Sequence, residues 1–144
     1  MRRWPLAVFS WAVPLLAACS GGEPVPEVDP ELVGATSVHV VSLSGWGSQE
    51  RPVPDTVRAE VGAAVIFQVA DWWVHTVEFV AEEMSPAQTG FIETHARMLS
   101  PPLVERGSRF VVSFAGAPPG TYPFRVDGFG DRATGAVVVT DPVP

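Results

Sequence analysis

The sequence predicts an all-β sandwich of about seven to eight strands in one domain. From Thr36 onward, short runs rich in valine, phenylalanine and isoleucine recur at intervals of about 8–12 residues. Fifteen prolines and thirteen glycines punctuate the chain, and no long segment has the period of an amphipathic helix. A length of 144 residues suits one such domain with a hydrophobic core, and is too short for two.

The expected strands are rich in β-branched and aromatic residues and end beside glycine, proline or polar clusters. This is the pattern of strands joined by turns. Only Glu93–Leu99 suggests a short helix, inside the long connection between residues 81 and 106. In chain order the expected strands are Ser37–Leu43, Thr56–Glu60, Ala64–Val69, His75–Val80, Arg109–Phe114, Gly120–Val126 and Gly135–Thr140.

Alternation along these runs predicts which side chains face the core. In the run after Trp73, the residues His75, Val77 and Phe79 share one face, with Thr76 opposite. We therefore expect His75 to be at least partly buried among apolar side chains.

The first eighteen residues have the order of a signal peptide. Arg2 and Arg3 form a short basic start, and Pro5–Ala18 is an uncharged apolar run. Fourteen helical residues reach about 21 Å, which is short of the roughly 30 Å core of a bilayer. A cleaved signal peptide over residues 1–18 is therefore expected rather than a membrane span.

The run ends Leu16-Ala17-Ala18-Cys19, and Cys19 is the only cysteine of the chain. This segment resembles the lipobox of bacterial lipoproteins, which implies that Cys19 carries the lipid and becomes the mature N-terminus. The alternative is an ordinary signal peptide with a cysteine near its cleavage site. Two or three acyl chains would hold a domain on a membrane stably, whereas a single chain would not.

Residues 19–34, rich in proline, glycine and acids, are expected to form an extended tether to a domain at 35–144. The protein is thus expected to be exported and lipid-anchored to the cell membrane or outer membrane, with its domain facing the periplasm or the extracellular space. A formal charge of −7 argues against a nucleic-acid partner.

Four segments between Val38 and Val139 resemble the cupredoxins, the blue-copper proteins of the plastocyanin type. The resemblance implies a Greek-key β-sandwich. The segments are Pro54–Phe67, Asp71–Phe79, Leu99–Leu103 followed by Gly107–Phe110, and Pro119–Val126 followed by Gly135–Val139.

A type 1 copper centre needs two imidazoles, a thiolate and usually an axial thioether. The resemblance places the first histidine at His75. It places the cysteine on Val126, the second histidine on Phe129, and the axial ligand on Ala133 or Thr134. Three of the four ligands are therefore missing from the expected positions.

With Cys19 committed to lipid, the expected domain contains no thiolate, so a type 1 centre is excluded on chemical grounds and no cofactor is expected. Val126 and Phe129 are expected to fill the former site with apolar packing, at about 1.5–3 kcal/mol each. The leading hypothesis is a cell-envelope binding or structural module.

Two alternatives remain. One is a copper or zinc carrier that uses His75 with non-thiolate ligands drawn from His39, His95, Asp71 or Glu93. The other is the copper-binding electron-transfer protein that the family resemblance alone would suggest. No nucleophile elbow, phosphate-binding loop or zinc-hydrolase helix is present, so an enzyme is not expected.

Two tryptophans are candidate binding residues. Trp46 lies on a glycine-flanked loop, and Trp72 should point away from the core if Trp73 points inward. Exposed aromatics on loops at one end of a sandwich are suited to bind a protein or a glycan of the envelope. The alternative is that both cover the edge of the core.

The lipid anchor predicts that the protein incorporates labelled palmitate in cells. The Cys19→Ala variant should lose all of this label and leave the membrane fraction, because no other residue can take the thioether. Label retained by the variant would contradict the lipobox hypothesis.

Overall fold

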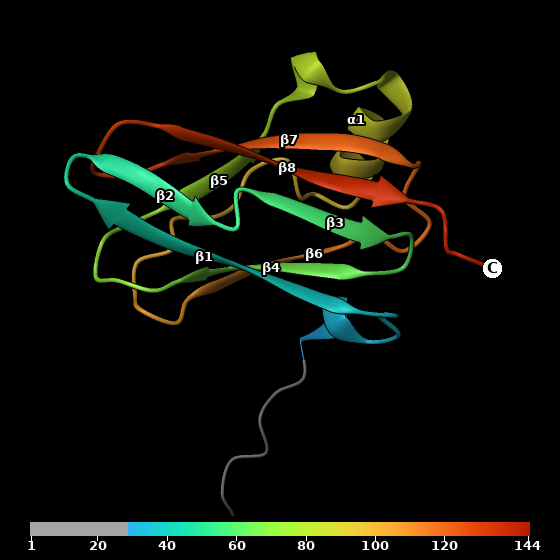
Figure 1. Ribbon diagram of the computed structural model, residues 1–144, viewed down its shortest axis with the longest axis horizontal. Helices are drawn as coiled ribbons and strands as arrows, with labels where there is room; N and C mark the ends of the chain where they lie inside the picture. Colours follow the sequence, from blue (N-terminus) through green and yellow to red (C-terminus); the bar gives the residue numbers. More distant parts are fainter. Residues whose placement is uncertain (1–28) are drawn as a thin grey trace, which may run out of the picture.

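The computed structural model describes residues 29–144 (Figure 1). The expected signal peptide, the lipidation site at Cys19 and the expected tether up to residue 28 lie outside the described residues. Within the described part, no helix combines the length and the apolar character needed to cross a bilayer.

The domain is a β-sandwich of two four-stranded sheets that face each other (Figure 1). The first sheet has the spatial order β2 (Gln49–Val53), β1 (Val38–Trp46), β4 (Ala64–Val69), β6 (Arg109–Ser113). The second has the order β3 (Thr56–Glu60), β8 (Ala133–Thr140), β7 (Gly120–Asp127), β5 (Thr76–Phe79). Two 3-10 turns, η1 (Pro30–Leu32) and η2 (Ala81–Glu83), and one helix, α1 (Pro86–Thr94), lie outside the sheets.

The connections have Greek-key character. Only β1–β2 and β7–β8 follow each other within one sheet, and every other connection crosses to the opposite sheet. As a result, β1 pairs with β4 and β3 pairs with β8 in parallel, while the remaining pairs are antiparallel. Parallel neighbours require such long crossings, because a tight hairpin can join only antiparallel strands.

The core lies between the sheets and is rich in aromatic rings. Phe67 of β4 meets Phe124 of β7 edge-to-face with ring centroids 5.0 Å apart, and Phe79 of β5 at 6.3 Å. Tyr122 is fully buried and donates its hydroxyl to the carbonyl of Pro118 at 2.6 Å, so its one polar atom is satisfied. The predicted alternation in β5 is confirmed, since His75, Val77 and Phe79 are all buried.

The sequence failed to predict β2. The segment Gln49-Glu50-Arg51-Pro52-Val53 is polar and contains a proline, which argues against a strand. It forms one because it is an edge strand, where a missing N–H is tolerated, and it pairs with the second half of β1.

The expected position of the helix, Glu93–Leu99, was wrong. The helix spans Pro86–Thr94 and starts at a capping box, in which Ser85 accepts from the backbone of Gln88 and Gln88 accepts from the backbone of Ser85. Proline at its first position also favours a helix start. These signals stand in the sequence, but the surrounding glycine and threonine weaken the apolar period.

The described chain enters the sandwich at the end opposite to the tip of β1 (Figure 1). Glu31 of η1 pairs with Arg97 at 2.7 Å, and Thr36 donates its backbone N–H to Gly62 at 2.9 Å. From there β1 runs nine residues, about 30 Å, to Trp46. The entry point and the Trp46 loop therefore lie at opposite ends of the domain.

Candidate functional site

Three connections meet at the end of the sandwich that carries Trp46. They are the β1–β2 turn, the β4–β5 loop and the β7–β8 turn. Asp71 of the β4–β5 loop accepts from the backbone N–H of Gly45, at the end of β1, at 2.7 Å. Glu50, at the start of β2, donates its backbone N–H to Asp131 of the third at 2.9 Å. We call this region the aromatic end, defined by Trp46, Trp72, Trp73 and Phe129.

His75 lies beneath this end, fully buried, and holds two carboxylates. Its Nδ1 lies 2.7 Å from Glu50 Oε2, and its Nε2 lies 2.8 Å from Asp71 Oδ1. A carboxylate only accepts, so both contacts are hydrogen bonds together when both ring nitrogens carry a hydrogen and donate. The three side chains then carry one net negative charge, and neither nitrogen offers a lone pair.

Asp71 accepts three hydrogen bonds in all. Besides His75 and the N–H of Gly45, it accepts from the N–H of Trp73 at 2.9 Å. Burial by itself acts to raise the pKa of Asp71. The hydrogen bonds from His75, Gly45 and Trp73, with the attraction of the His75 charge, outweigh burial and lower the pKa below its ordinary value of 3.8.

Glu50 is more deeply buried, with a side chain that is inaccessible to solvent. Its second oxygen, Oε1, has no hydrogen-bond partner in the described part of the protein. A β-carbon at position 128 would overlap this oxygen and also the carbonyl of Val74. Gly128 is therefore required, because it lets the β7–β8 turn close directly over the carboxylate.

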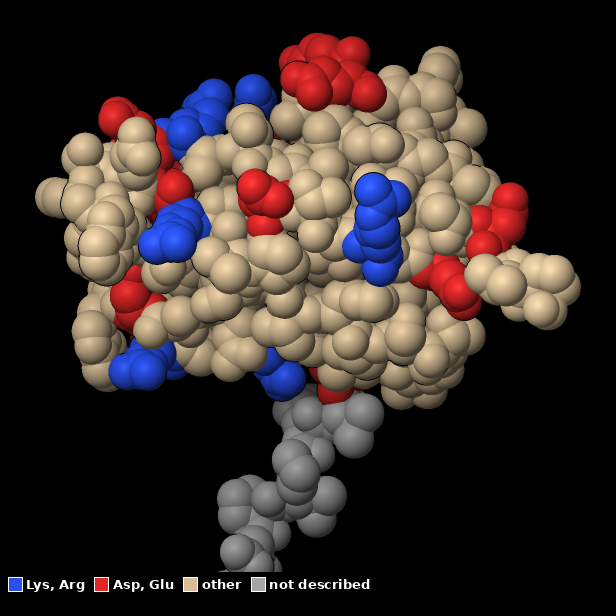
Figure 2. All heavy atoms as spheres, viewed as in Figure 1, with Lys and Arg blue, Asp and Glu red and all other residues tan. Residues whose placement is uncertain are grey.

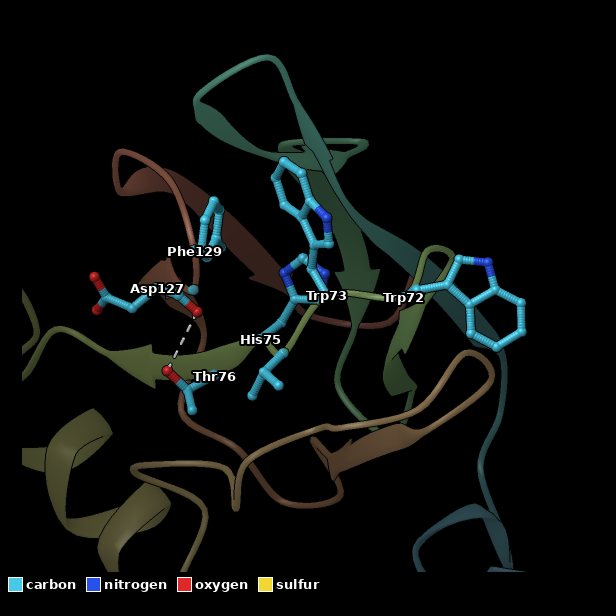
Figure 3. A pocket seen from close by; sticks show the side chains of 8 residues that line it. Trp72, Trp73, His75, Thr76, Asp127 and Phe129 are labelled. Carbon is cyan, nitrogen blue, oxygen red and sulfur yellow. Dashed lines mark hydrogen bonds between the residues drawn. The ribbon is translucent and has the colours of Figure 1, made fainter.

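A pocket of about 570 Å³ opens at the surface above His75 (Figure 3). Phe129 and Trp73 stand side by side with ring centroids 5.5 Å apart, and Trp72 lies to one side of them. A β-carbon on Gly45 would overlap the Trp73 ring, so that glycine makes room for it. The lining residues are Trp72, Trp73, Val74, His75, Thr76, Asp127, Gly128 and Phe129.

The polar side chains of this pocket are already bonded within the protein. The Thr76 hydroxyl donates to the carbonyl of Asp127 at 3.4 Å, and the Asp127 carboxylate accepts from Arg132 Nε at 2.6 Å. His75 is held by its two carboxylates. The pocket thus offers rings and aliphatic carbon, with negative charge beneath them, and few free hydrogen-bonding groups.

The two predicted binding tryptophans are exposed, rather than packed over the core edge. Trp46 is 74% exposed and Trp72 is 78% exposed. Each has a guanidinium over its ring, Arg51 at 5.9 Å from Trp46 and Arg106 at 6.0 Å from Trp72. Within residues 29–144 neither arginine forms an ion pair with a carboxylate.

The positions that the family resemblance assigns to copper ligands differ in their burial and in their place in the fold. Val126 is fully buried on β7, and Ala133, the assigned axial position, is the first residue of β8. The expectation that Phe129 fills the former site was wrong, since it is 84% exposed. Gly128 brings the turn down onto Glu50, so the interior is taken by the Glu50–His75 pair and the next side chain points outward.

His39 and His95 are not brought to His75 as co-ligands. His39 contacts the Ser37 hydroxyl at 3.3 Å on the surface, and His95 Nδ1 donates to the Phe91 carbonyl at 2.8 Å at the end of α1. Glu93 is exposed on that helix. Among residues 29–144 no group of three or more His, Cys, Asp or Glu side chains is arranged to hold a metal ion.

Sequence reasoning named Asp71 beside His75 but missed Glu50. The signal was available in the alternation of β2, where Glu50 and Pro52 share the buried face and their neighbours are exposed. It was lost because β2 itself was not recognised. A lone glutamate in a polar stretch reads as a solvated residue unless the strand is known.

Comparison with solved structures gives the fold class. Oxidised plastocyanin from Dryopteris crassirhizoma matches with a TM-score of 0.51 and 19% identity, covering 70% of this chain and 99% of that chain. A reduced amicyanin mutant has a TM-score of 0.49 and 21% identity over 79% and 87% of the two chains. A purple cupredoxin from Nitrosopumilus maritimus has a TM-score of 0.46 and 17% identity over 71% and 99%.

The protein therefore has the cupredoxin-like β-sandwich fold that its sequence predicted, on the strength of the plastocyanin match. No family model matches the sequence, and no curated protein matches it either. At this level of identity the likeness shows the fold alone, so function has to be argued from the site.

Removing the carboxylate of Glu50, the more deeply buried of the two, should destabilise the domain strongly. In Glu50→Ala the buried Nδ1–H of His75 loses its acceptor, and breaking such a buried charged contact costs about 3–5 kcal/mol. Urea unfolding measures the loss. Glu60→Ala, the same change at an exposed residue of β3, should shift stability by less than about 0.5 kcal/mol. Equal effects of both changes would contradict the role assigned to Glu50.

The lowered pKa of Asp71 predicts a specific acid sensitivity. A carboxyl with a depressed folded-state pKa adds stability that is complete above its unfolded value, near 3.8, and is lost as the pH falls through the lower folded value. Wild type should therefore exceed Asp71→Asn in free energy of unfolding at neutral pH, with the gap narrowing below pH 3.8. Asp55→Asn, the same change at an exposed position, is the control.

Proposed function

We propose that this protein is a lipid-anchored binding module of the cell envelope whose ligand contacts the aromatic end, and that it neither carries type 1 copper nor acts as an enzyme. The observation that carries the proposal is the hydrogen bonding of His75. Both of its ring nitrogens are engaged by carboxylates beneath an exposed aromatic pocket. The histidine at the position that the resemblance assigns to a copper ligand thus serves structure, and the surface above it is exposed.

The donor set does not fit a blue-copper centre. The described domain contains no cysteine, Val126 is buried with no ligand atom, and Phe129 carries none. A copper or zinc carrier built on His75 is also poorly supported. A metal would have to displace Glu50 or Asp71 from a nitrogen, which would undo a buried charged contact.

The surface at the aromatic end supports a binding role. Three aromatic side chains there, Trp46, Trp72 and Phe129, are each at least 74% exposed. Large exposed aromatics gathered on one end of a soluble domain are uncommon unless they meet a partner or ligand. A pocket of about 570 Å³ also falls in the range of small-ligand sites.

The proposed anchor suits this arrangement. The described chain enters at the end of the sandwich opposite to Trp46 (Figure 1). A lipid at Cys19 would join the domain through that entry end, at the opposite end of the sandwich from the aromatic end. Cleavage and lipidation at Cys19 thus belong to the same proposal as the binding surface.

The copper part of the proposal is tested by adding copper(II) to the purified domain. We expect no intense blue absorption band, because such a band arises from a copper–thiolate bond and the domain lacks the thiolate. Stoichiometric copper binding that His75→Ala abolishes would favour the carrier alternative. A strong blue colour would overturn the proposal.

The binding part is tested by a thermal-shift screen of small molecules, glycans and peptides. Ligands of the aromatic end should raise the Tm of wild type, as any ligand of the native state does, but not that of Phe129→Ser. Val38→Ser is the matched control, since Val38 is also exposed but lies at the other end of β1. Ligands that stabilise both variants equally would contradict the assignment of the surface.

A further inference from the structure

We infer that the pocket above His75 binds a small solute carrying a quaternary ammonium group, an inference that rests on the proposed binding role of the aromatic end. Three properties of the pocket combine: aromatic walls, uncompensated negative charge beneath the floor, and polar side chains that are already satisfied. Each property narrows the chemistry of the ligand.

The aromatic walls favour a cation. The rings of Trp73 and Phe129 lie together above His75, and Trp72 flanks them (Figure 3). Ring faces attract positive charge within about 6 Å, and most strongly those of tryptophan. Trp72 already shows this affinity, because Arg106 lies over its ring at 6.0 Å, and Arg106 is not among the residues that line the pocket.

The charge under the pocket is negative. His75 is surrounded by the two carboxylates of Glu50 and Asp71, which leave at least one net negative charge beneath the floor. Glu50 Oε1 has no hydrogen-bond partner in the described chain and lies directly behind Gly128, which lines the pocket. At the rim, the carboxylate of Asp127 is neutralised by Arg132. A cation over this floor is therefore better matched than a neutral or anionic group.

The chain as a whole has a net negative charge. The whole chain carries a formal charge of −7, and acidic side chains gather over the segment of η2 at the top of the molecule (Figure 2). Such a field raises the local concentration of cations and opposes anions. This electrostatic field acts at long range, so it attracts cations in general and does not favour one cation over another.

The hydrogen-bonding state of the polar groups distinguishes one kind of cation from another. Thr76 and His75 make their hydrogen bonds inside the protein, and Asp127 is paired with Arg132 through one of its carboxylate oxygens. A primary ammonium or a guanidinium would lose its hydrogen bonds to water here and find few replacements, at a cost in desolvation. A trimethylated ammonium has no N–H to satisfy, and its methyl groups contact rings and Val74. The pocket thus fits a quaternary ammonium best.

The ligand is inferred to be a free solute rather than the headgroup of a membrane lipid. The described chain enters the domain at the far end, so the pocket lies at the opposite end from the point where an anchor would join the domain. The volume of about 570 Å³ also suits a small molecule.

Choline is the probe, with 3,3-dimethylbutanol as its uncharged match of equal shape and ethanolamine as the match that has N–H groups. Calorimetry on the protein should show choline binding about 2- to 30-fold more tightly than 3,3-dimethylbutanol, the range of a cation–π contribution. Ethanolamine should bind more weakly than choline. Equal or tighter binding of the alcohol, or of ethanolamine, would overturn the inference.

Variants locate the site. Phe129→Ser and Trp72→Ala should weaken choline binding, and Trp46→Ala, a change of equally exposed tryptophan outside the pocket, should not. Both mutated pocket rings are exposed, so folding is preserved and the comparison stays interpretable. Loss of binding in Trp46→Ala alone would contradict the assigned pocket.

Two further experiments are needed. One distinguishes a free solute from the headgroup of a lipid, and the other distinguishes failure of the quaternary-ammonium inference from failure of the proposed binding role. Vesicles of phosphatidylcholine and of phosphatidylglycerol should leave the domain in solution, and cosedimentation with phosphatidylcholine without binding of free choline would overturn the choice of a solute. If choline fails while another ligand class stabilises wild type but not Phe129→Ser, the quaternary-ammonium inference falls and the binding module stands. If no ligand depends on Phe129, the proposed function falls as well.

Discussion

The aromatic end depends on one buried interaction, the pair of hydrogen bonds that hold His75 between Glu50 and Asp71. We call this interaction the clasp. It ties the β1–β2 turn, the β4–β5 loop and the start of β5 together beneath the surface. Burying these charges is costly, and the cost is offset only while both hydrogen bonds of the imidazole are intact. The clasp is therefore better understood as a device that fixes loop positions than as a source of stability. With the loops fixed below, the tryptophans above them stay exposed instead of collapsing onto the core.

Most of the fold could be predicted from local patterns, because apolar and polar residues alternate along a strand that has one buried face. β7, with Tyr122, Phe124 and Val126 buried and the residues between them more exposed, is an example. β2 could not, since its pairing is decided by β1 rather than by its own composition. Phe129 shows the limit at the site. Its outward direction is set by the close approach of Gly128 to Glu50, a contact between residues 78 positions apart that no local pattern reveals.

The cupredoxin-like fold and the chemistry of the site are separate matters in this protein. The likeness to plastocyanin extends over most of the sandwich, yet it carries 19% identity and concerns the scaffold. A histidine at the position of His75 has two opposite uses. As a ligand it offers a lone pair outward to a metal, and here it offers N–H groups to carboxylates on both sides. The difference lies in its neighbours, above all in Glu50, rather than in the histidine.

The opposite placement of chain entry and aromatic end also has a mechanical consequence. β1 begins near the entry point, ends at Trp46, and lies between β2 and β4. A pull between an N-terminal attachment and a ligand held at the aromatic end acts along this strand. Its ladder bonds to β4 are then strained together, in shear, instead of opening one after another from an end. The domain is thus built to carry tension along the direction in which its proposed tether would apply it.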